Sequence, residues 1–309
     1  MRGQRGEAQA GHPVLMTLLL LVLAGCASHS GAFRPDAEID PIEQLALHQR
    51  LSGAPSPEQC EDLHLASFNV KLPEDRSRLE RLRVDILGDE LLRMADVWLL
   101  QEIETIDGQN AVEYLADEFG SLNYVYAPSR ITDDGDTHGL AILSRFPLRK
   151  VERLWLPRFN LVANSRDRIA LTATVDLCGR PVKVYNVHLD TRLNFGARRT
   201  QLSSILDAAA PHQRVVVAGD FNTNSFLWLG HLLPIPWSSQ AKKLDRLMTE
   251  AGHSAPFAKL GGTAKMGARL DAIYVKGLSA DEPAIGPWMA ESDHRPLHVL
   301  LGEADPSPP

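Results

Sequence analysis

Short apolar runs alternate with segments of helical periodicity over most of the sequence. The apolar runs predict buried strands at residues 63–70, 97–101, 140–143, 171–177, 182–187, 215–218, 270–275 and 297–301. Apolar residues at helical spacing predict helices at 77–94, 198–210 and 242–251. A Cys-Gly-Arg-Pro turn between 171–177 and 182–187 indicates a β-hairpin, so the strands are not all joined by βα repeats. The pattern therefore predicts an α/β sandwich with mixed sheets.

The N-terminus has a different pattern. Residues 14–24 (VLMTLLLLVLA) are apolar, follow Arg2 and Arg5, and precede a Gly-Cys pair. A basic start, a short apolar run and small residues are typical of a secretory signal peptide, and the run is too short to span a hydrocarbon layer of roughly 30 Å. The sequence Leu-Ala-Gly-Cys ending at Cys26 also resembles the lipobox of bacterial lipoproteins. This resemblance implies acylation of Cys26 and anchoring in the cell envelope, at the outer membrane facing the periplasm or the exterior.

The rest of the chain divides by composition. After a signal segment at 1–26, residues 27–58 are rich in Pro, Ser, Gly and Ala and indicate a tether with one short helix around 41–51. We expect one catalytic domain at 59–303 and a frayed tail at 304–309. Cys60 and Cys178 remain once Cys26 is assigned to lipid. In an oxidising compartment they form either a disulfide or two buried thiols, and the sequence leaves both open.

Bulk composition narrows the function classes only mildly. The chain has 309 residues, of which 44% are hydrophobic and 23% charged, as in ordinary globular proteins. Its formal net charge of −7 argues against a strongly basic nucleic-acid surface over the whole molecule. A local basic surface is still compatible with this charge, because a carboxylate-rich metal site is itself acidic.

Carboxylate, amide and imidazole side chains stand where the apolar runs end. They are Asn69, Glu102, His188, Asp220, Asn222, Asp271, Asp293 and His294. Strand ends and the loops beyond them are where rigid scaffolds place functional groups. A set rich in oxygen donors suits Mg²⁺, with Mn²⁺ as the alternative, better than Zn²⁺.

These residues lie in sequence blocks that resemble the endonuclease–exonuclease–phosphatase superfamily, in particular exonuclease III, pancreatic deoxyribonuclease and neutral sphingomyelinase. The matching blocks are SFNV, LLQEIE, GLAILSRFP, YNVHLD, VVVAGDFNTNS, RLDAIYV and SDHRPL, which occur in the family's order over residues 65–300. The resemblance implies a four-layer α/β sandwich of two packed mixed β-sheets flanked by helices. It also implies a Mg²⁺-dependent phosphodiesterase in which water attacks phosphorus.

The resemblance implies a role for each strand-end residue. Glu102 is the principal metal ligand, Asn69 lies next to it, and Asp293 completes or supports the metal site. The remaining five act on the substrate. Asp220 and Asn222 orient the attacking water and the phosphate, and Asp271 holds His294 towards the scissile phosphate. His188 supplies a second imidazole, which favours the deoxyribonuclease and sphingomyelinase branches.

The sequence leaves the substrate open. Arg168, Arg192 and Arg198 lie near the motifs, where they either contact flanking phosphates or are ordinary surface charges. Trp228 belongs to an apolar segment, 225–238, that is either a packed helix and loop or a membrane-facing lip. We therefore expect a monomer acting on a phosphodiester, with a nuclease-type activity first. The alternative is a phospholipase C- or sphingomyelinase-like lipid phosphodiesterase or phosphatase at the membrane surface.

Overall fold

A computed structural model gives the structure of most of the chain. It describes residues 46–51, 62–71, 75–106, 109–120, 122–133, 135–159, 167–177, 179–191, 193, 195–223, 226–229, 233–236, 240–289 and 291–304. The signal segment with Cys26, most of the tether, Cys60, Cys178, Arg192 and nearly all of the tail lie outside these ranges. The expectations for them remain predictions.

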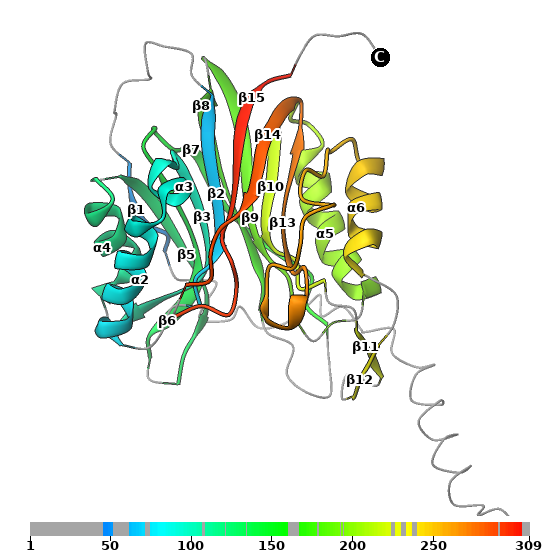
Figure 1. Ribbon diagram of the computed structural model, residues 1–309, viewed down its shortest axis with the longest axis horizontal. Coiled ribbons are helices and arrows are strands. Elements are labelled where there is room, and N and C mark those ends of the chain that lie inside the picture. The colour runs from blue at the N-terminus through cyan, green and yellow to red at the C-terminus, as the bar shows by residue number, and fades with distance from the viewer. Residues whose placement is uncertain are drawn as a thin grey trace, which may run out of the picture.

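Two mixed sheets form the centre of the molecule (Figure 1). The larger sheet has the order β1 (His48–Arg50), β5 (Asn123–Ile131), β6 (Thr137–Ser144), β3 (Val97–Ile106), β2 (Leu63–Asn69), β15 (Leu297–Glu303) and β14 (Leu278–Ile285), with β4 (Gln109–Asn110) paired to β3. The smaller sheet has the order β13 (Asp271–Lys276), β10 (Val215–Asp220), β9 (Arg180–His188), β8 (Ile169–Leu177) and β7 (Arg149–Trp155). The pairs β2–β3 and β9–β10 are parallel, and the other pairs in the two sheets are antiparallel.

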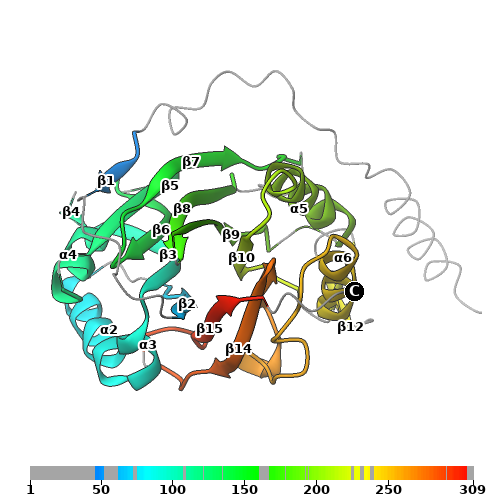
Figure 2. The same ribbon diagram turned by 90° about the horizontal axis from the view of Figure 1, so that it is seen from above.

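Helices cover the outer face of each sheet (Figure 2). The larger sheet carries α2 (Arg76–Gly88), α3 (Glu90–Met94) and α4 (Ala111–Glu118), and the smaller carries α5 (Phe195–Ala209) and α6 (Gln240–Glu250). A single turn of 3-10 helix, η2 (Lys265–Gly267), precedes β13. One apolar cluster fills the space between the sheets, and a further cluster lies under each helical layer. This arrangement confirms the predicted four-layer sandwich.

The central strands are apolar throughout because both of their faces are covered. Along β3, Leu99 faces the other sheet, whereas Trp98 and Leu100 face the helices. Along β2, Leu65 and Phe68 divide in the same way. Strands buried on both faces are expected to be continuous apolar runs rather than alternating ones. These runs are the pattern that made the central strands predictable.

A buried pair of amides joins the two sheets directly. Gln101 on β3 donates from Nε2 to Oδ1 of Asn186 on β9 at 2.7 Å, and both residues are fully buried. Asn186 in turn donates from Nδ2 to the carbonyl oxygens of Leu100 and Ala141, each at 2.8 Å. A buried amide left unpaired costs about 1–3 kcal/mol, so these bonds favour one alignment of the sheets. Glu102, directly after Gln101, and His188, two residues after Asn186, are positioned by the same bonds.

Several sequence-based expectations are corrected by the backbone. Residues 48–50 form an edge strand paired with β5 rather than part of a helix, and Arg50 pairs with Asp117 at 2.7 Å and lies over the Tyr124 ring. The helix expected at 77–94 is split at Asp89, whose side chain accepts from the Leu92 N–H at 2.9 Å and starts a second helix.

The segment after Asn222 also differs from the helix-and-loop reading. Its backbone forms a hairpin of β11 (Phe226–Leu229) and β12 (Leu233–Pro236). Trp228 lies on β11, and the structure describes only its backbone. Among the helices of the described ranges, none is both long and apolar enough to cross a membrane.

Besides β11 and β12, the sequence analysis missed β1, β4, β5, β7, β14, α4 and η2, and several of these elements are half exposed. β7 and β14 are edge strands, and their burial is mixed rather than continuous. β14 also contains Pro283 and two acidic residues, a composition that disfavours a strand assignment. These strands are fixed by pairing with their neighbours rather than by a local pattern.

A histidine pair on β2 and β15 leads to a prediction about acid stability. Nδ1 of His64 and Nε2 of His298 are 3.1 Å apart, and His298 is buried. Burial, followed by the neighbouring His64, lowers the pKa of His298 from 6.5 to about 4. Between these pH values the unfolded chain binds the extra proton, so the free energy of unfolding falls as the pH drops through this window.

We expect His298→Gln to flatten this dependence in denaturant unfolding curves recorded between pH 7 and pH 4.5. The exposed His48→Gln substitution is the matched control and should leave the dependence as in the wild type. An acid dependence unchanged in His298→Gln would contradict the assignment.

Candidate active site and metal centre

The strand-end residues meet at one end of the sandwich. β2 ends at Asn69, β9 at His188 and β10 at Asp220. Parallel pairing of β9 with β10 sets His188 opposite Asp220, and antiparallel pairing with β13 sets Asp220 opposite Asp271. The two sheets thus contribute to one cluster.

Two of the site residues have backbone angles in the left-handed region. Glu102 has φ 55°, in the left-handed region, at a register shift of β3 against β6. Asn222 has φ 52° in the turn after β10. Non-glycine residues at such angles cost on the order of 1–3 kcal/mol and cluster at functional sites. The bulge interrupts the alternation of side chains between the two faces of β3 at Glu102.

Gly219 permits the close packing next to Asp220. Its φ is 140°, and a Cβ atom at this position would lie 2.0 Å from the carbonyl oxygen of Val187. No side chain fits there, which explains the glycine before Asp220.

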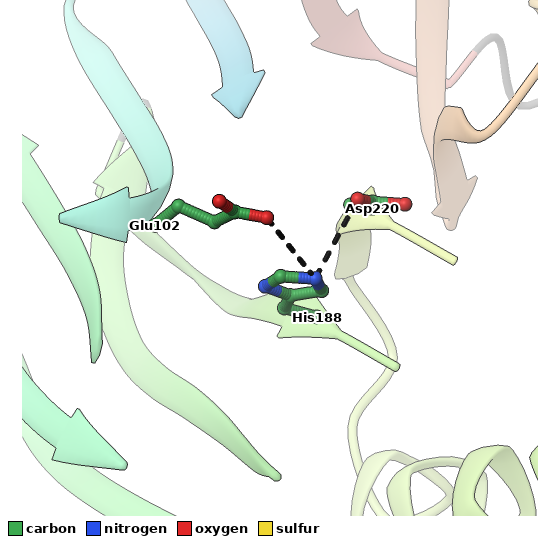
Figure 3. Close-up of side chains that lie close together, drawn as sticks. All are labelled: Glu102, His188 and Asp220. Atoms are coloured by element: carbon green, nitrogen blue, oxygen red, sulfur yellow. Dashed lines mark ion pairs between the residues drawn. The ribbon is translucent and has the colours of Figure 1, made fainter. Parts of the chain in front are cut away.

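An amide joins two carboxylates at the centre of the cluster. Nδ2 of Asn69 donates to Oε1 of Glu102 at 3.1 Å and to Oδ2 of Asp220 at 3.0 Å. Nε2 of His188 lies 3.7 Å from the same Glu102 oxygen and 3.6 Å from the same Asp220 oxygen (Figure 3). The ligand atoms of Glu102, His188 and Asp220 all lie within 4.8 Å of one another. These three side chains are close enough together to hold one metal ion.

The second imidazole is held by a chain of hydrogen bonds. Nδ1 of His294 lies 2.8 Å from Oδ2 of Asp271, and the same oxygen accepts from Oγ1 of Thr263 at 2.6 Å. Since a carboxylate only accepts, Nδ1 of His294 carries hydrogen and Nε2 is directed to Oδ2 of Asp220, 3.8 Å away. The hydroxyl of Thr263 accepts from the backbone N–H of Asp271 at 3.1 Å. Asp271 therefore fixes both the tautomer and the orientation of His294.

The charges of the cluster favour proton uptake. Burial and the nearby Asp271 carboxylate raise the pKa of Asp220 to about 7. Burial opposes charging of His294, but Asp271 and Asp220 outweigh it and raise its pKa to about 10. The cluster thus carries an excess of negative charge.

Two further side chains hold the loops around the cluster. The N–H of Asn222 donates to Oδ1 of Asp220 at 2.8 Å, and its Nδ2 donates to the carbonyl of Leu189 at 2.8 Å. Ser292 donates from Oγ to the carbonyl of Asn69 at 2.7 Å and accepts from the N–H of His294 at 3.0 Å. Asn222 therefore ties the turn after β10 to the loop after β9.

Asp293 stands slightly apart from the other predicted metal ligands. Its Oδ2 is 2.8 Å from Nζ of Lys71, and its side chain is 33% exposed. It belongs to neither of the two groups of converging ligand atoms found among the described residues. Asp293 therefore lies at the rim of the site, paired with a cation that the sequence analysis did not single out.

Two of the predicted substrate-binding arginines, Arg168 and Arg198, are buried. Arg198 is 2% exposed, and its Nε and Nη2 donate to the carbonyl of Leu193 at 3.1 and 2.6 Å. This burial assigns Arg198 to holding the loop after β9 rather than to touching a substrate. Arg168 is also buried and reaches Oγ1 of Thr191 from Nη2 at 3.4 Å.

Thr263 and Ser292 were missed by the sequence analysis. Thr263 lies eight residues before its partner Asp271, in a loop, and no periodicity or spacing marks it. Ser292 directly precedes Asp293 and His294, and this adjacency was the only available signal.

The donor set fits a hard divalent cation. Glu102, Asp220 and Asp271 supply carboxylates, and none of them forms an ion pair with a Lys or Arg within the described ranges. Glu102 is 31% exposed, so the cluster is open to solvent on its side. Carboxylate oxygens with an open side suit Mg²⁺ or Mn²⁺.

Comparisons with known proteins agree with this fold. The sequence model described as "Endonuclease/Exonuclease/phosphatase family" matches residues 66–294. No curated protein sequence matches the chain.

Solved structures are similar in fold at low identity. An endonuclease/exonuclease/phosphatase from Beutenbergia cavernae has a TM-score of 0.60 and 18% identity, covering 79% of this chain and 72% of that chain. A family protein from Leptotrichia buccalis has a TM-score of 0.59 and 17% identity over 77% of this chain and 99% of its own. The human Nocturnin catalytic domain, solved with a bound sulfate anion, has a TM-score of 0.58 and 18% identity over 85% of this chain and 98% of its own. At such identities the likeness shows the fold alone.

Proposed function

The chain belongs to the endonuclease/exonuclease/phosphatase family, and from this premise we propose that it hydrolyses phosphodiesters with a bound divalent cation, Mg²⁺ or Mn²⁺. Family membership by itself supports a hydrolase of phosphoester bonds. One observation carries the finer proposal. A half-buried carboxylate from the larger sheet, Glu102, and a buried one from the smaller sheet, Asp220, converge on the Asn69 amide beside two imidazoles, and neither forms an ion pair with a Lys or Arg within the described ranges.

The proposed metal site centres on Glu102, with Asn69 and Asp220 beside it and Asp293 at the rim. A cation bound there would polarise a phosphoryl oxygen and offset charge on the leaving oxygen. Glu102 approaches from the larger sheet and Asp220 from the smaller, so the ligands are held on rigid elements.

The protein groups have complementary proposed roles. His294, fixed by Asp271, presents Nε2 to the phosphate, and Asp220 orients the attacking water. His188 faces the same space and either clamps a phosphate oxygen or protonates the leaving oxygen. Asn222 keeps Asp220 in place through its backbone N–H.

A nuclease-type phosphodiesterase is the first proposal for the substrate. The second is a lipid phosphodiesterase or phosphatase, favoured by the apolar segment 225–238 that directly follows the Asp220 turn and by the proposed acylation of Cys26. Acylation would place the enzyme in the cell envelope, next to its lipid substrate. We propose a monomer in either case.

A substrate panel tests the function. The full chain, with Mg²⁺ or with EDTA, is assayed on plasmid DNA, RNA, sphingomyelin vesicles and bis(p-nitrophenyl) phosphate. We expect EDTA-sensitive hydrolysis of DNA and of the generic diester, restored by adding Mg²⁺ or Mn²⁺. Absence of EDTA-sensitive hydrolysis on every substrate would refute the proposal.

The panel also separates the two substrate classes. If the lipid alternative holds, vesicles are cleaved faster than soluble esters, and Trp228→Ser with Trp237→Ser lowers vesicle activity while sparing the soluble ester. Equal losses on both substrates would indicate a packing role for the two tryptophans.

A further inference from the structure

A basic pocket lies far from the catalytic cluster. It has a volume of about 370 Å³, and its cationic or titratable lining residues are Lys150, Arg180, Lys183, His212 and Arg214. Lys183 is paired with Val215 at the start of β10, whereas His188 is paired with Asp220 at its end. At roughly 3.3 Å per residue, this separation is about 17 Å along the strand. The pocket therefore lies towards the opposite end of the smaller sheet and is distinct from the proposed active site.

Two of the cations are buried in the wall of the pocket. The side chain of Lys183 is 4% exposed, and its Nζ donates to the carbonyl of Lys150 at 2.8 Å. The side chain of Arg214 is 10% exposed, and its Nε has no hydrogen-bond partner within the described residues. Because this N–H is inaccessible to water, Arg214 acts on the pocket through its charge rather than through this atom.

The carboxylates around the pocket are more loosely held than the cations. Glu152, 3.3 Å from Nζ of Lys183, has a side chain that is 70% exposed. Glu303 is 38% exposed and is shared by Arg180 and Arg214, at 3.2 and 2.7 Å. Exposed partners of this kind contribute little free energy and can move aside when another anion arrives.

The positive potential extends to the histidine at the rim. Burial, followed by the charges of Lys183 and Lys150, lowers the pKa of His212. His212 is therefore neutral near pH 7 and offers a ring N–H to a ligand without adding charge. Lys150 forms no ion pair through its ammonium group in the part of the chain described, so its charge remains available.

We propose that this pocket binds a phosphate-bearing ligand, either a soluble phosphate ester or the headgroup of an anionic phospholipid. The exposed Arg180 and Lys150 can give short, charge-assisted hydrogen bonds to phosphate oxygens, with Arg matching their geometry in a bidentate fashion, and the buried Lys183 and Arg214 add positive charge behind them. The volume exceeds what one phosphate needs and is within the usual range of small-molecule pockets, about 300–1,000 Å³. The site is independent of the catalytic proposal, because none of its residues belongs to the Glu102 cluster.

The test measures binding of inorganic phosphate to the full chain by calorimetry, in EDTA and at constant ionic strength. Without a cation the catalytic cluster is anionic and repels phosphate, so the signal comes from elsewhere. Lys150→Gln with Arg180→Gln removes two accessible cations from the pocket without touching the buried Lys183 and Arg214. Lys242→Gln with Lys259→Gln, at exposed positions outside the pocket, is the control with the same change of charge.

We expect saturable binding in the wild type and the control, and at least about tenfold weaker binding in the pocket variant. Glu152→Gln removes a competing carboxylate at an exposed position and should tighten binding about two- to fivefold. Equal phosphate affinity in the wild type, the pocket variant and the control would overturn the proposal.

Vesicles identify the source of the phosphate group. Phosphatidylglycerol vesicles that bind the wild type more tightly than the pocket variant, and are displaced by free phosphate, support a lipid headgroup as the ligand. Phosphate binding that depends on the pocket, without any such vesicle binding, supports a soluble ester.

Discussion

Glu102→Gln is expected to lower kcat/KM for phosphodiester hydrolysis by about 10²–10³-fold or more, with a matching loss of Mg²⁺ binding. Glutamine has the same size as glutamate, and its carbonyl oxygen can still accept from Nδ2 of Asn69, so the packing is kept. What the substitution removes is the negative charge that a divalent cation requires. The measurement pairs steady-state kinetics with a Mg²⁺ titration followed by the rise in Tm, since a ligand that binds only the folded state raises stability.

The matched control is Glu104→Gln, two residues along the same strand. This substitution makes the same change of charge, but Glu104 pairs with Arg130 at 3.7 Å rather than with the residues of the cluster. We expect near wild-type kinetics and an unchanged metal-induced rise in Tm. If Glu102→Gln showed a wild-type metal titration together with wild-type activity, the proposed metal site would be wrong.

Asp271→Asn is expected to lower kcat by on the order of 10³-fold with a smaller change in KM. The carboxylate accepts from both Nδ1 of His294 and Oγ1 of Thr263 through the same oxygen, Oδ2. An amide loses the charge that stabilises the protonated imidazole and can present its NH₂ group to Nδ1, which selects the wrong tautomer. A variant that keeps wild-type kcat would exclude this positioning role.

Two substitutions of Thr263 test whether its hydroxyl positions Asp271. Thr263→Val keeps the shape and the Asp271 charge but removes the hydroxyl donor, and we expect roughly a tenfold lower kcat. Thr263→Ser restores the hydroxyl and should recover most of the activity. Equal activities of the valine and serine variants would show that the hydroxyl does not position Asp271. Circular dichroism and Tm confirm that each variant is folded.

The sequence predicted the central strands and most of the cluster because both follow from local rules. Asn69, His188 and Asp220 come directly at the ends of apolar runs, and parallel strands bring their carboxyl ends together. Glu102 was identified by the same reasoning, but its bulge was not, because a register shift against β6 depends on the partner strand.

The remaining features depend on contacts between segments distant in sequence. The Lys71–Asp293 pair joins residues more than two hundred positions apart. The cations of the basic pocket lie on β7, the β8–β9 hairpin and the segment before β10, and no linear motif links them. Such features appear only once the sheets are assembled.

The Gln101–Asn186 contact between the sheets has a consequence for inactivation. Asn69 and Glu102 belong to one sheet, and His188 and Asp220 to the other, so neither half of the sandwich contains a usable centre. If the interface opens, the two buried amides lose their partners and the two halves of the centre separate in the same event. The catalytic lifetime at high temperature is then set by the rate at which the sheets part, and partially opened molecules are inactive.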